Sequence, residues 1–282
     1  MKVLRTVADA RAFRAASAGT QLGLVPTMGA LHAGHGSLVE RAVRENGATV
    51  VSIFVNPTQF GPHEDLTAYP RREADDLAQL ERLGGAAAFV PSVAEMYPPG
   101  DETRVQPGAM AARLEGAARP GHLVGVATVV TKLFAIVRPD VAYFGQKDFQ
   151  QLRVVQALAR DLHLGVRVVG CPTVRDADGL ALSSRNAYLS ADERRAALAL
   201  PRGLFAARSD WERGERDPKR LADRVRQHAA ALALEYVSVA DPLTLVEVTR
   251  GAERAVISVA ARVGKARLID NVLLGMDLAD LV

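Results

Sequence analysis

The feature that most constrains the fold is a series of short apolar segments without the polar and apolar alternation of half-exposed strands. Such segments are typical of parallel strands covered by helices on both faces. Segments with helical periodicity lie between them, and this order predicts a doubly wound parallel sheet of the α/β class. The predicted strands are 22–25, 49–55, 87–90, 141–144 and 166–169, and the predicted helices are 37–46, 72–83, 126–137 and 149–162.

The pattern changes after Cys171-Pro172, where Asp176-Ala-Asp-Gly179 has the composition of a turn. Two Arg- and Ala-rich helical segments follow, and the last fifty or so residues favour short strands. We therefore predict a first domain over 1–175, a hinge at about 176–181 and a smaller C-terminal α+β domain over 182–282. The helices of the second domain are expected at 190–208 and 218–233, and its strands at 235–239, 254–260 and 267–271.

Composition excludes several classes of protein. Of the 282 residues, 49% are hydrophobic and 24% are charged, which is typical of a globular soluble chain. The single cysteine, Cys171, excludes an internal disulfide and any metal site that needs two thiolates from one chain. The 35 basic and 32 acidic residues are interspersed, so nucleic-acid binding is disfavoured. Charged residues such as Arg5 and Asp9 stand where a signal peptide would be apolar, so we expect a cytoplasmic protein without membrane contact.

A histidine pair follows the first predicted strand. The segment Leu24-Val-Pro-Thr-Met-Gly-Ala-Leu-His-Ala-Gly-His35 turns at Gly29 and enters a helix near Gly34. The two imidazoles, of His32 and His35, then lie at a helix N-terminus, where free amides and the helix dipole favour an anion such as phosphate. Two alternatives remain at this point: a turn with two partly exposed histidines, or a metal site completed by a distant carboxylate.

A second polar segment, Gly145-Gln-Lys-Asp-Phe-Gln-Gln151, follows the strand predicted at 141–144. Lys147 can reach phosphate oxygens as a point charge, and Asp148 can accept from a ribose hydroxyl or help to hold a hydrated Mg²⁺. The carboxyl ends of parallel strands meet at one edge of the sheet, where open α/β sheets bind ligands. An ordinary helix start with an acidic first turn explains the same residues.

Three further groups of residues complete the candidate site. The hydroxyls and guanidinium of Leu182-Ser-Ser-Arg-Asn186 suit the β and γ oxygens of a nucleotide, although a simple helix cap has the same composition. Asn56 and Gln59 follow the second strand and direct amides at the same edge. Three valines share one helix face at spacings of three and four residues, which indicates core packing first and a branched apolar substrate pocket second. These valines are Val126, Val129 and Val130.

The chain lacks both Gly-x-Gly-x-x-Gly and the P-loop string, which argues against a dinucleotide dehydrogenase or a P-loop kinase. Along nearly its whole length it resembles instead the pantoate:β-alanine ligase family. Six blocks carry the resemblance in order: Val25-Pro-Thr-Met-Gly29, His32-Ala-Gly-His35, Val51-Ser-Ile-Phe-Val-Asn-Pro-Thr-Gln-Phe60, Gly145-Gln-Lys-Asp-Phe-Gln-Gln151, Leu182-Ser-Ser-Arg-Asn186 and Arg267-Leu-Ile-Asp-Asn271.

The resemblance implies a Rossmann-like nucleotidyltransferase domain, a smaller C-terminal lid domain, a homodimer, and ATP with Mg²⁺. It implies ATP-dependent condensation of pantoate with β-alanine to pantothenate, AMP and pyrophosphate through a pantoyl-adenylate intermediate. One alternative is a nucleotidyltransferase of the same superfamily that stops at an activated nucleotide product. A nucleotide-sensing module is disfavoured because Gln59, Gln151 and the valine face supply a second site beside the nucleotide.

The resemblance also implies roles for individual residues. The catalytic residues would be His35, His32, Lys147 and Arg185. Pantoate and β-alanine would bind Gln59, Gln151, Asn56, Val126, Val129 and Val130. The ATP contacts would be Met28, Gly29, Ala30, Leu31, His32, Ala33, Gly34, His35, Gly145, Gln146, Lys147, Asp148, Val174, Leu182, Ser183, Ser184 and Arg185. No residue is assigned to a protein-bound metal.

The sequence departs from the family pattern at a few positions. Ala33 and Gln146 stand where acidic residues are usual, and Leu123-Val124 replaces an aromatic and a small or polar residue. Gly36 directly after His35 is the most unusual, because glycine in a helix costs up to about 1 kcal/mol relative to alanine. We expect it to loosen the histidine pair.

Overall fold

The computed structural model describes residues 1–62 and 64–281, and these divide into two compact units. The first comprises Met1–Phe144 and Gln151–Cys171, and the second comprises Gly145–Gln150 and Pro172–Val282. This division differs from the predicted domain limits in two respects. The segment Gly145–Gln150 and residues 172–175, which include the predicted ATP contact Val174, belong to the second unit, although the predicted first domain included them.

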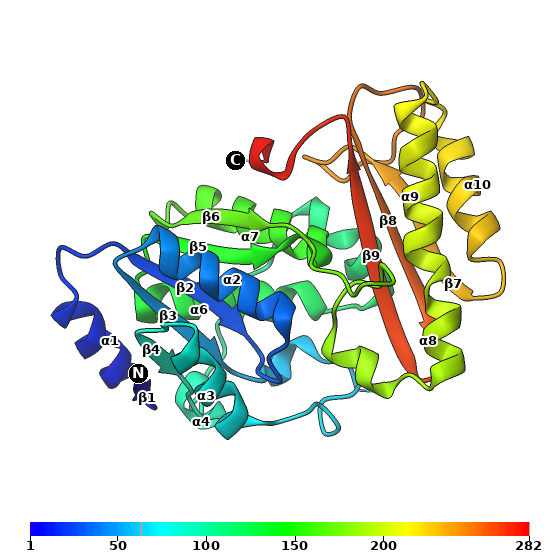
Figure 1. The fold of residues 1–282 in the computed structure, drawn as a ribbon. Helices are drawn as coiled ribbons and strands as arrows, with labels where there is room; N and C mark the ends of the chain where they lie inside the picture. The colour runs from blue at the N-terminus through cyan, green and yellow to red at the C-terminus, as the bar shows by residue number, and fades with distance from the viewer. Residues whose placement is uncertain (63, 282) are drawn as a thin grey trace. The chain divides into compact units, whose positions relative to one another are not determined.

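The first unit is built on a six-stranded sheet in the order β1-β4-β3-β2-β5-β6 (Figure 1). Each of the five predicted strands is present, and the α/β fold class is confirmed. The additional edge strand β1 has only three residues, too few for a sequence pattern to reveal. The strands are β1 Lys2–Leu4, β2 Leu22–Thr27, β3 Ala48–Ile53, β4 Ala87–Phe89, β5 Val141–Gly145 and β6 Arg167–Cys171.

Apolar side chains cover both faces of this sheet, as the absence of alternation predicts. Val25 and Val51 belong to a buried cluster with Leu38 and Leu80 of two helices. The neighbouring Leu24 points to the opposite face and is also completely buried. The helices of this unit are α1 Val7–Ala16, α2 Ala33–Glu45, α3 Glu73–Arg82, α4 Val93–Met96, α5 Leu114–Ala118, α6 His122–Val137 and α7 Phe149–Asp161, with 3-10 turns η1 Pro57–Gln59 and η2 Ala109–Ala112.

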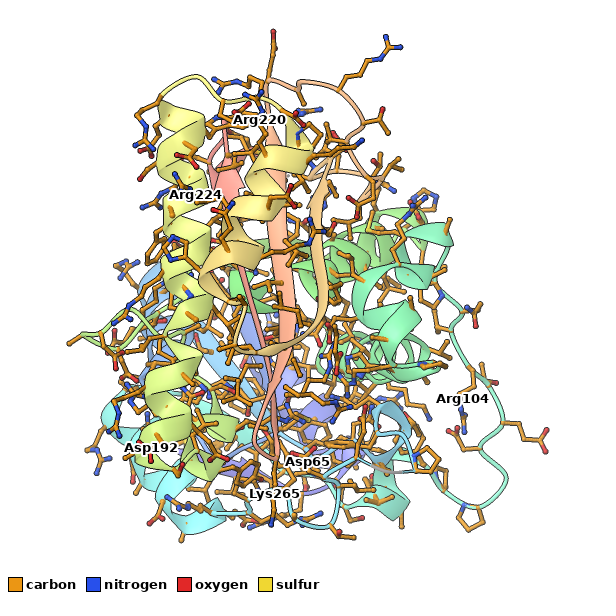
Figure 2. All side chains as sticks on the ribbon, turned by 90° about the vertical axis from the view of Figure 1, so that its right-hand side faces the viewer. Asp65, Arg104, Asp192, Arg220, Arg224 and Lys265 are labelled. Carbon is orange, nitrogen blue, oxygen red and sulfur yellow. The ribbon has the colours of Figure 1, made fainter. Side chains whose placement is uncertain are left out.

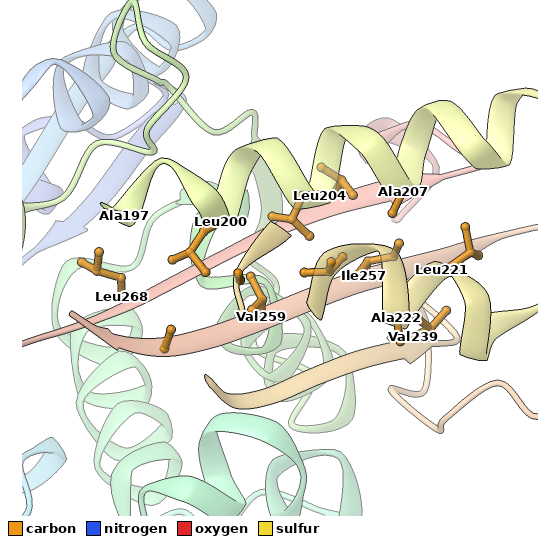
Figure 3. Close-up of a cluster of buried hydrophobic side chains, with 14 of the residues drawn as sticks. Ala197, Leu200, Leu204, Ala207, Leu221, Ala222, Val239, Ile257, Val259 and Leu268 are labelled. Atoms are coloured by element: carbon orange, nitrogen blue, oxygen red, sulfur yellow. The ribbon is translucent and has the colours of Figure 1, made fainter. Parts of the chain in front are cut away.

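The second unit is an α+β structure whose sheet is antiparallel in the order β7-β8-β9. Its strands are β7 Ala233–Ala240, β8 Ala255–Val263 and β9 Ala266–Leu274, and its helices are α8 Ala191–Ala197, α9 Ala199–Glu212 and α10 Pro218–His228. The 3-10 turns are η3 Gln146–Asp148, η4 Ser184–Tyr188 and η5 Leu278–Asp280. Figure 3 shows that Leu200 and Leu204 of α9 pack with Leu221 of α10 over Ile257 and Val259 of β8.

Two helix predictions for this unit are wrong in detail. The helix expected over 190–208 is two helices that meet at Leu198, and Pro201 lies in the first turn of the second one, where a missing N–H is tolerated. The helix expected to reach residue 233 ends at His228, because β7 begins at Ala233. The polar faces of α9 and α10 are joined by an ion pair between Arg224 and Asp210 at 2.7 Å. Figure 2 labels Arg220 and Arg224, both of α10.

Across residues 1–62 and 64–281, no helix combines the length and the apolar character needed to span a membrane.

Candidate active site

The histidine pair caps the N-terminus of α2, the helix that follows β2 (Figure 1). The His32 Nδ1 accepts the Gly34 N–H at 3.1 Å, and the His35 Nδ1 accepts the His32 N–H at 3.4 Å. The centroids of the two imidazole rings are 4.1 Å apart. Each histidine is therefore held by main-chain groups two or three residues away, and the two rings lie side by side as the sequence predicts.

This cap fixes which nitrogen of each ring carries the proton. An Nδ1 that accepts a hydrogen bond is unprotonated, so the proton of each neutral imidazole is on Nε2. In the neutral rings both Nε2–H groups are donors, and they belong to a helix start whose first main-chain amides have no intrahelical partners. A helix dipole of this orientation adds attraction for a negative group. The arrangement suits a phosphate bound by neutral donors.

A buried carboxylate of α3 holds the turn that leads into this helix. Asp76, which is 3% exposed, accepts the Ala30 N–H at 2.9 Å through Oδ2 and the Leu31 N–H at 2.8 Å through Oδ1. Gly29 and Ala30 both have positive φ, 82° and 50°, a conformation that alanine adopts only when its surroundings enforce it. Burial raises the pKa of Asp76, although its two backbone hydrogen bonds oppose the shift.

Asp76 is absent from the residues selected by sequence, although the sequence contains a signal for it. It is spaced four residues before the buried Leu80 and so lies on the apolar face of α3. A carboxylate on an apolar helix face must have buried partners. An acidic residue four positions before a predicted core leucine would therefore have indicated a carboxylate with a structural role.

A cavity of about 260 Å³ opens beside the turn. It is lined by residues that follow three neighbouring strands, including Met28 and Gly29 after β2, Phe54 after β3 and Ser92 after β4. This is the carboxyl edge of the sheet, where open α/β sheets bind ligands. Asp76 forms part of the wall, so the carboxylate that fixes the turn also borders the cavity.

The predicted substrate amides are oriented by a chain of hydrogen bonds. The Asn56 Oδ1 accepts from the Tyr97 hydroxyl at 2.8 Å and from the Thr58 hydroxyl at 3.0 Å. The Asn56 Nδ2 is thereby directed to the Gln59 Oε1, at 3.0 Å. Gln59 in turn directs its Nε2 at the Met28 sulfur, 3.2 Å away. Gln59 therefore directs an N–H donor at the turn that begins with Met28.

Sequence reasoning also missed Tyr97, which belongs to the irregular segment after α4 and has no motif of its own. Burial raises the pKa of its hydroxyl. Its ring faces the Lys132 ammonium, 4.7 Å from the ring centroid. Tyr97 is thus a neutral donor whose partner, Asn56, controls the Gln59 amide.

The turn η1, which ends at Gln59, packs closely on α6. A Cβ at Gly125 would lie 2.3 Å from the Thr58 carbonyl oxygen, so only glycine permits this approach. The His122 Nδ1 lies 2.9 Å from the Gln59 carbonyl oxygen.

The three valines predicted to line an apolar pocket lie on α6 and are buried, with Val126 2%, Val129 6% and Val130 3% exposed. Gln151 is half-buried in the first turn of α7.

An ion pair holds the segment that follows η1. Arg119 donates to both carboxylate oxygens of Glu64 at 2.6 Å. Burial raises the pKa of Glu64, but the hydrogen bonds and charge of Arg119 outweigh it and lower the pKa to about 2. Burial lowers the pKa of His122, and the positive charge of Arg119 lowers it further. His122 therefore stays neutral beside Gln59.

The lysine segment is the turn η3, in the second unit. The Lys147 ammonium lies 3.9 Å from the Asp148 carboxylate. The turn has no side-chain cap of its own, but the buried Asn271 donates to the carbonyls of Gln146 and Lys147. These contacts explain why the segment belongs to the second unit.

The serine segment is the turn η4. The residue that caps its N-terminus, Ser183, accepts the Arg185 N–H at 3.3 Å, and the Asn186 side chain donates to the Ala181 carbonyl at 3.0 Å. The Leu182 N–H donates to the Val174 carbonyl at 3.0 Å. Two of the predicted ATP contacts, Val174 and Leu182, are therefore neighbours although eight positions separate them in the sequence.

These features define the class of the protein: it is an enzyme of the α/β type with a Rossmann-like parallel sheet and a small antiparallel second unit. The chain belongs to the pantoate-beta-alanine ligase family, whose model matches residues 2–273. It is 56% identical over 278 residues to a pantothenate synthetase of Chloroflexus aurantiacus, with 97% of this chain and 98% of the relative covered. It is 55% identical over 277 residues to one of Roseiflexus sp., with coverages of 97% and 99%.

Solved structures of the family agree. The crystal structure of pantothenate synthetase from Thermus thermophilus matches with a TM-score of 0.92 at 48% identity, covering 96% of this chain and 99% of that one. The pantoate-beta-alanine ligase of Francisella tularensis, complexed with "Beta-gamma ATP" and β-alanine, matches with a TM-score of 0.81 at 33% identity and 99% coverage of both chains.

Proposed function

We propose that this chain condenses pantoate with β-alanine in an ATP-dependent reaction that yields pantothenate, AMP and pyrophosphate through pantoyl adenylate. Family membership over nearly the whole chain is the observation that carries the proposal. The family relative from Francisella tularensis, which holds an ATP compound and β-alanine, supports the choice of substrates. The alternative, a nucleotidyltransferase that stops at the activated product, is not favoured by any of these relatives.

The chemistry requires activation because a carboxylate has only oxide as a leaving group. The pantoate carboxylate would attack the α-phosphorus of ATP and displace pyrophosphate, and the β-alanine amine would then attack the acyl carbon and expel AMP. The protein supplies no nucleophile in this scheme. Its contribution is to orient the reactants and to stabilise the charge that develops on the phosphates.

We assign the phosphate contacts to the residues that the family resemblance implies. The Nε2–H groups of His32 and His35 and the first amides of α2 bind phosphate oxygens. Lys147 and Arg185 supply positive charge. The remaining ATP contacts belong to the segments 28–35, 145–148 and 182–185 and to Val174.

We assign the substrate contacts to Gln59, Gln151 and Asn56, with the three valines against the gem-dimethyl group of pantoate. The current partner of the Gln59 Nε2 is the Met28 sulfur at 3.2 Å, and a thioether is a weak acceptor. A pantoate oxygen is a stronger acceptor and would replace it. The geometry of Gln59 therefore favours a substrate that brings an oxygen to this position.

The proposal includes Mg²⁺ bound with ATP. Among the residues that the structure describes, 1–62 and 64–281, no three His, Cys, Asp or Glu side chains gather in a metal-binding cluster. Mg²⁺ keeps several waters and commonly uses one or two carboxylates with the substrate's phosphates. The half-exposed Asp148 carboxylate, 50% exposed, fits that limited role. We further propose a homodimer in the cytoplasm, on the family resemblance alone.

A two-stage assay tests the reaction. With ATP, Mg²⁺ and pantoate alone, the enzyme should release about one pyrophosphate per active site in the first turnover, because the adenylate has no amine to react with. Addition of β-alanine should start continuous turnover, with AMP and the amide detected by mass spectrometry. Turnover of pyrophosphate without an amide product would favour the alternative nucleotidyltransferase.

A metal-exchange experiment tests the role of Mg²⁺. Removal of divalent ions with a chelator should stop pyrophosphate release, and Mg²⁺ alone should restore it, because Mg²⁺ prefers oxygen ligands to imidazole. Restoration by Zn²⁺ but not by Mg²⁺ would instead indicate that the histidines are metal ligands.

A further inference from the structure

One of the sequence blocks shared with the family, Arg267-Leu-Ile-Asp-Asn271, has no part in the reaction as described so far. It lies in β9 of the second unit, where Asp270 is 4% and Asn271 is 2% exposed. Neither residue has the apolar character of its neighbours in the sheet. Buried polar side chains in a strand must have specific partners.

All the hydrogen bonds of the Asn271 side chain go to the lysine segment. Its Nδ2 donates to the carbonyl of Gln146 at 2.9 Å and to that of Lys147 at 3.0 Å. Its Oδ1 accepts from the Gln146 Nε2 at 3.2 Å. One planar amide therefore holds two consecutive peptide groups and one side chain, which determines both the position and the direction of the turn.

A second buried pair fixes Asn271 itself. Arg175 donates to both Asp270 oxygens, at 2.6 and 2.8 Å, and the Asn271 main-chain N–H donates to the Asp270 Oδ1 at 2.8 Å. The Arg175 guanidinium also lies 4.9 Å from the centroid of the Phe205 ring. Because such bidentate pairs are geometrically restrictive, the Asn271 backbone has little freedom to shift along β9.

We infer that Asn271 is a positioning residue that places Lys147 for the adenylation step, with Asp270 and Arg175 supporting it. The inference rests on the proposed role of Lys147. The turn Gln146–Asp148 has three residues, and its N-cap residue Gly145 makes no side-chain hydrogen bond. The carbonyls of Gln146 and Lys147 are instead held by the Asn271 amide, so the direction of the main chain that carries Lys147 depends on β9.

Two substitutions of Asn271 and one of Lys147 test the inference. Asn271→Ala removes all three hydrogen bonds, and Asn271→Asp keeps the shape and the acceptor but removes both donors. In each folded variant the rate of pyrophosphate release should fall about 10- to 100-fold, the cost of a small displacement of a charged group. The KM for pantoate should stay within about twofold, since the pantoate contacts are in the first unit.

The double variant distinguishes positioning from general packing. If Asn271 acts through Lys147, then Asn271→Ala combined with Lys147→Ala should be no slower than Lys147→Ala alone. Additive losses would overturn the inference. Asn46→Ala is the matched control: its Nδ2 donates to the Ala42 carbonyl at 2.7 Å near the far end of α2, and its loss should lower stability without changing the rate.

The outcomes separate this inference from the proposed function. A normal rate for folded Lys147→Ala would remove the role of the lysine and the inference with it. A slow Lys147→Ala beside normal, folded Asn271→Asp and Asn271→Ala would overturn the inference alone. If the alanine variant fails to fold, Asn271→Asp decides the question, because it retains the volume of the side chain.

Discussion

The histidine turn and the lysine turn are two similar pieces of chain that are held in opposite ways. Each follows a strand of the parallel sheet and leads into a helix, α2 after β2 and α7 after β5. His32 and His35 accept from main-chain groups two and three residues away. The lysine turn is held by Asn271, which is 124 and 125 residues away in the sequence. Hydrogen bonds within one segment thus position the histidines, and hydrogen bonds from a distant strand position the lysine turn. Both groups are proposed to act in the same reaction.

The comparison teaches that the two turns respond differently to change. The hydrogen bonds that hold the histidine pair come from its own segment, and the Asp76 carboxylate holds the turn that precedes it. The lysine turn depends on the integrity of another sheet. Substitutions in β9 should therefore affect Lys147 and leave the histidines in place, while substitutions in α3 should do the reverse.

The largest effect is expected from removing a histidine. His35→Ala should slow adenylate formation about 100- to 1,000-fold, the typical cost of losing one donor to developing charge. The reaction of preformed pantoyl adenylate with β-alanine should change far less, because pyrophosphate has already left. Pyrophosphate release and amide formation, measured separately, check both statements.

His35→Asn separates the cap from the ring donor. Its side-chain oxygen can accept the His32 N–H, so the start of α2 should be preserved. It should nevertheless be nearly as slow as His35→Ala. A rate close to that of the unsubstituted enzyme would show that the cap alone matters and that the ring contacts no phosphate.

The next effect is expected at Asp76, a distant support of the histidine turn. Asp76→Asn leaves one main-chain N–H without its acceptor and faces it with an amide N–H, which costs roughly 1–3 kcal/mol. We expect a lower melting temperature and an adenylation rate reduced about tenfold, with a raised KM for ATP. The exposed neighbour Asp75 is the control: Asp75→Asn should change neither. Equal effects of the two substitutions would contradict the positioning role.

A smaller effect is expected at Tyr97, which donates to Asn56 from 41 residues away and through it controls the Gln59 amide. Tyr97→Phe removes one donor and keeps the ring, so the KM for pantoate should rise about three- to tenfold, corresponding to roughly 1 kcal/mol. The KM for ATP should stay constant. Kinetics with each substrate varied in turn measure both.

Tyr143→Phe is the matched control for Tyr97→Phe. The Tyr143 hydroxyl is also buried and bonded, donating to Glu45 at 2.9 Å and accepting from Asn46 at 2.7 Å. Burial raises the pKa of that hydroxyl to about 12. Its loss should lower stability while both KM values stay constant. A rise in the KM for pantoate with this variant as well would mean that any buried tyrosine has the same effect.

The smallest effect is expected at Gly36, inside the histidine helix. A Cβ there would meet only ordinary contacts, with the Gln79 Nε2 at 3.7 Å and the Leu83 Cδ1 at 3.8 Å. Gly36→Ala should therefore stabilise the protein by about 0.5–1 kcal/mol, measured by chemical denaturation, with a rate within about twofold of the original. This expectation differs from the loosening predicted from the sequence, because both hydrogen bonds of the histidine pair are formed with Gly36 in place. A large gain in rate would mean that the glycine does loosen the pair.

The sequence by itself determined the layers of the fold and the location of the histidines. Apolar runs without alternation identified the parallel strands because burial on both faces leaves no polar positions. The histidine cap could be anticipated because its partners are within three residues, a distance at which helix geometry alone dictates contact. The family blocks added the remaining candidate residues, and their assigned roles are still predictions.

The tertiary structure decided what supports those residues. Asp76, Tyr97 and Asn271 each act on a partner at least 41 positions away, and no periodicity encodes such a pairing. The tertiary structure also decided that the lysine turn belongs to the second unit. Two hydrogen bonds join this turn to β9, although in the chain it lies between β5 and α7. Local patterns fix the elements, since they arise from neighbours in sequence. The partners of a buried polar group depend on which elements meet, and only the folded chain brings those elements together.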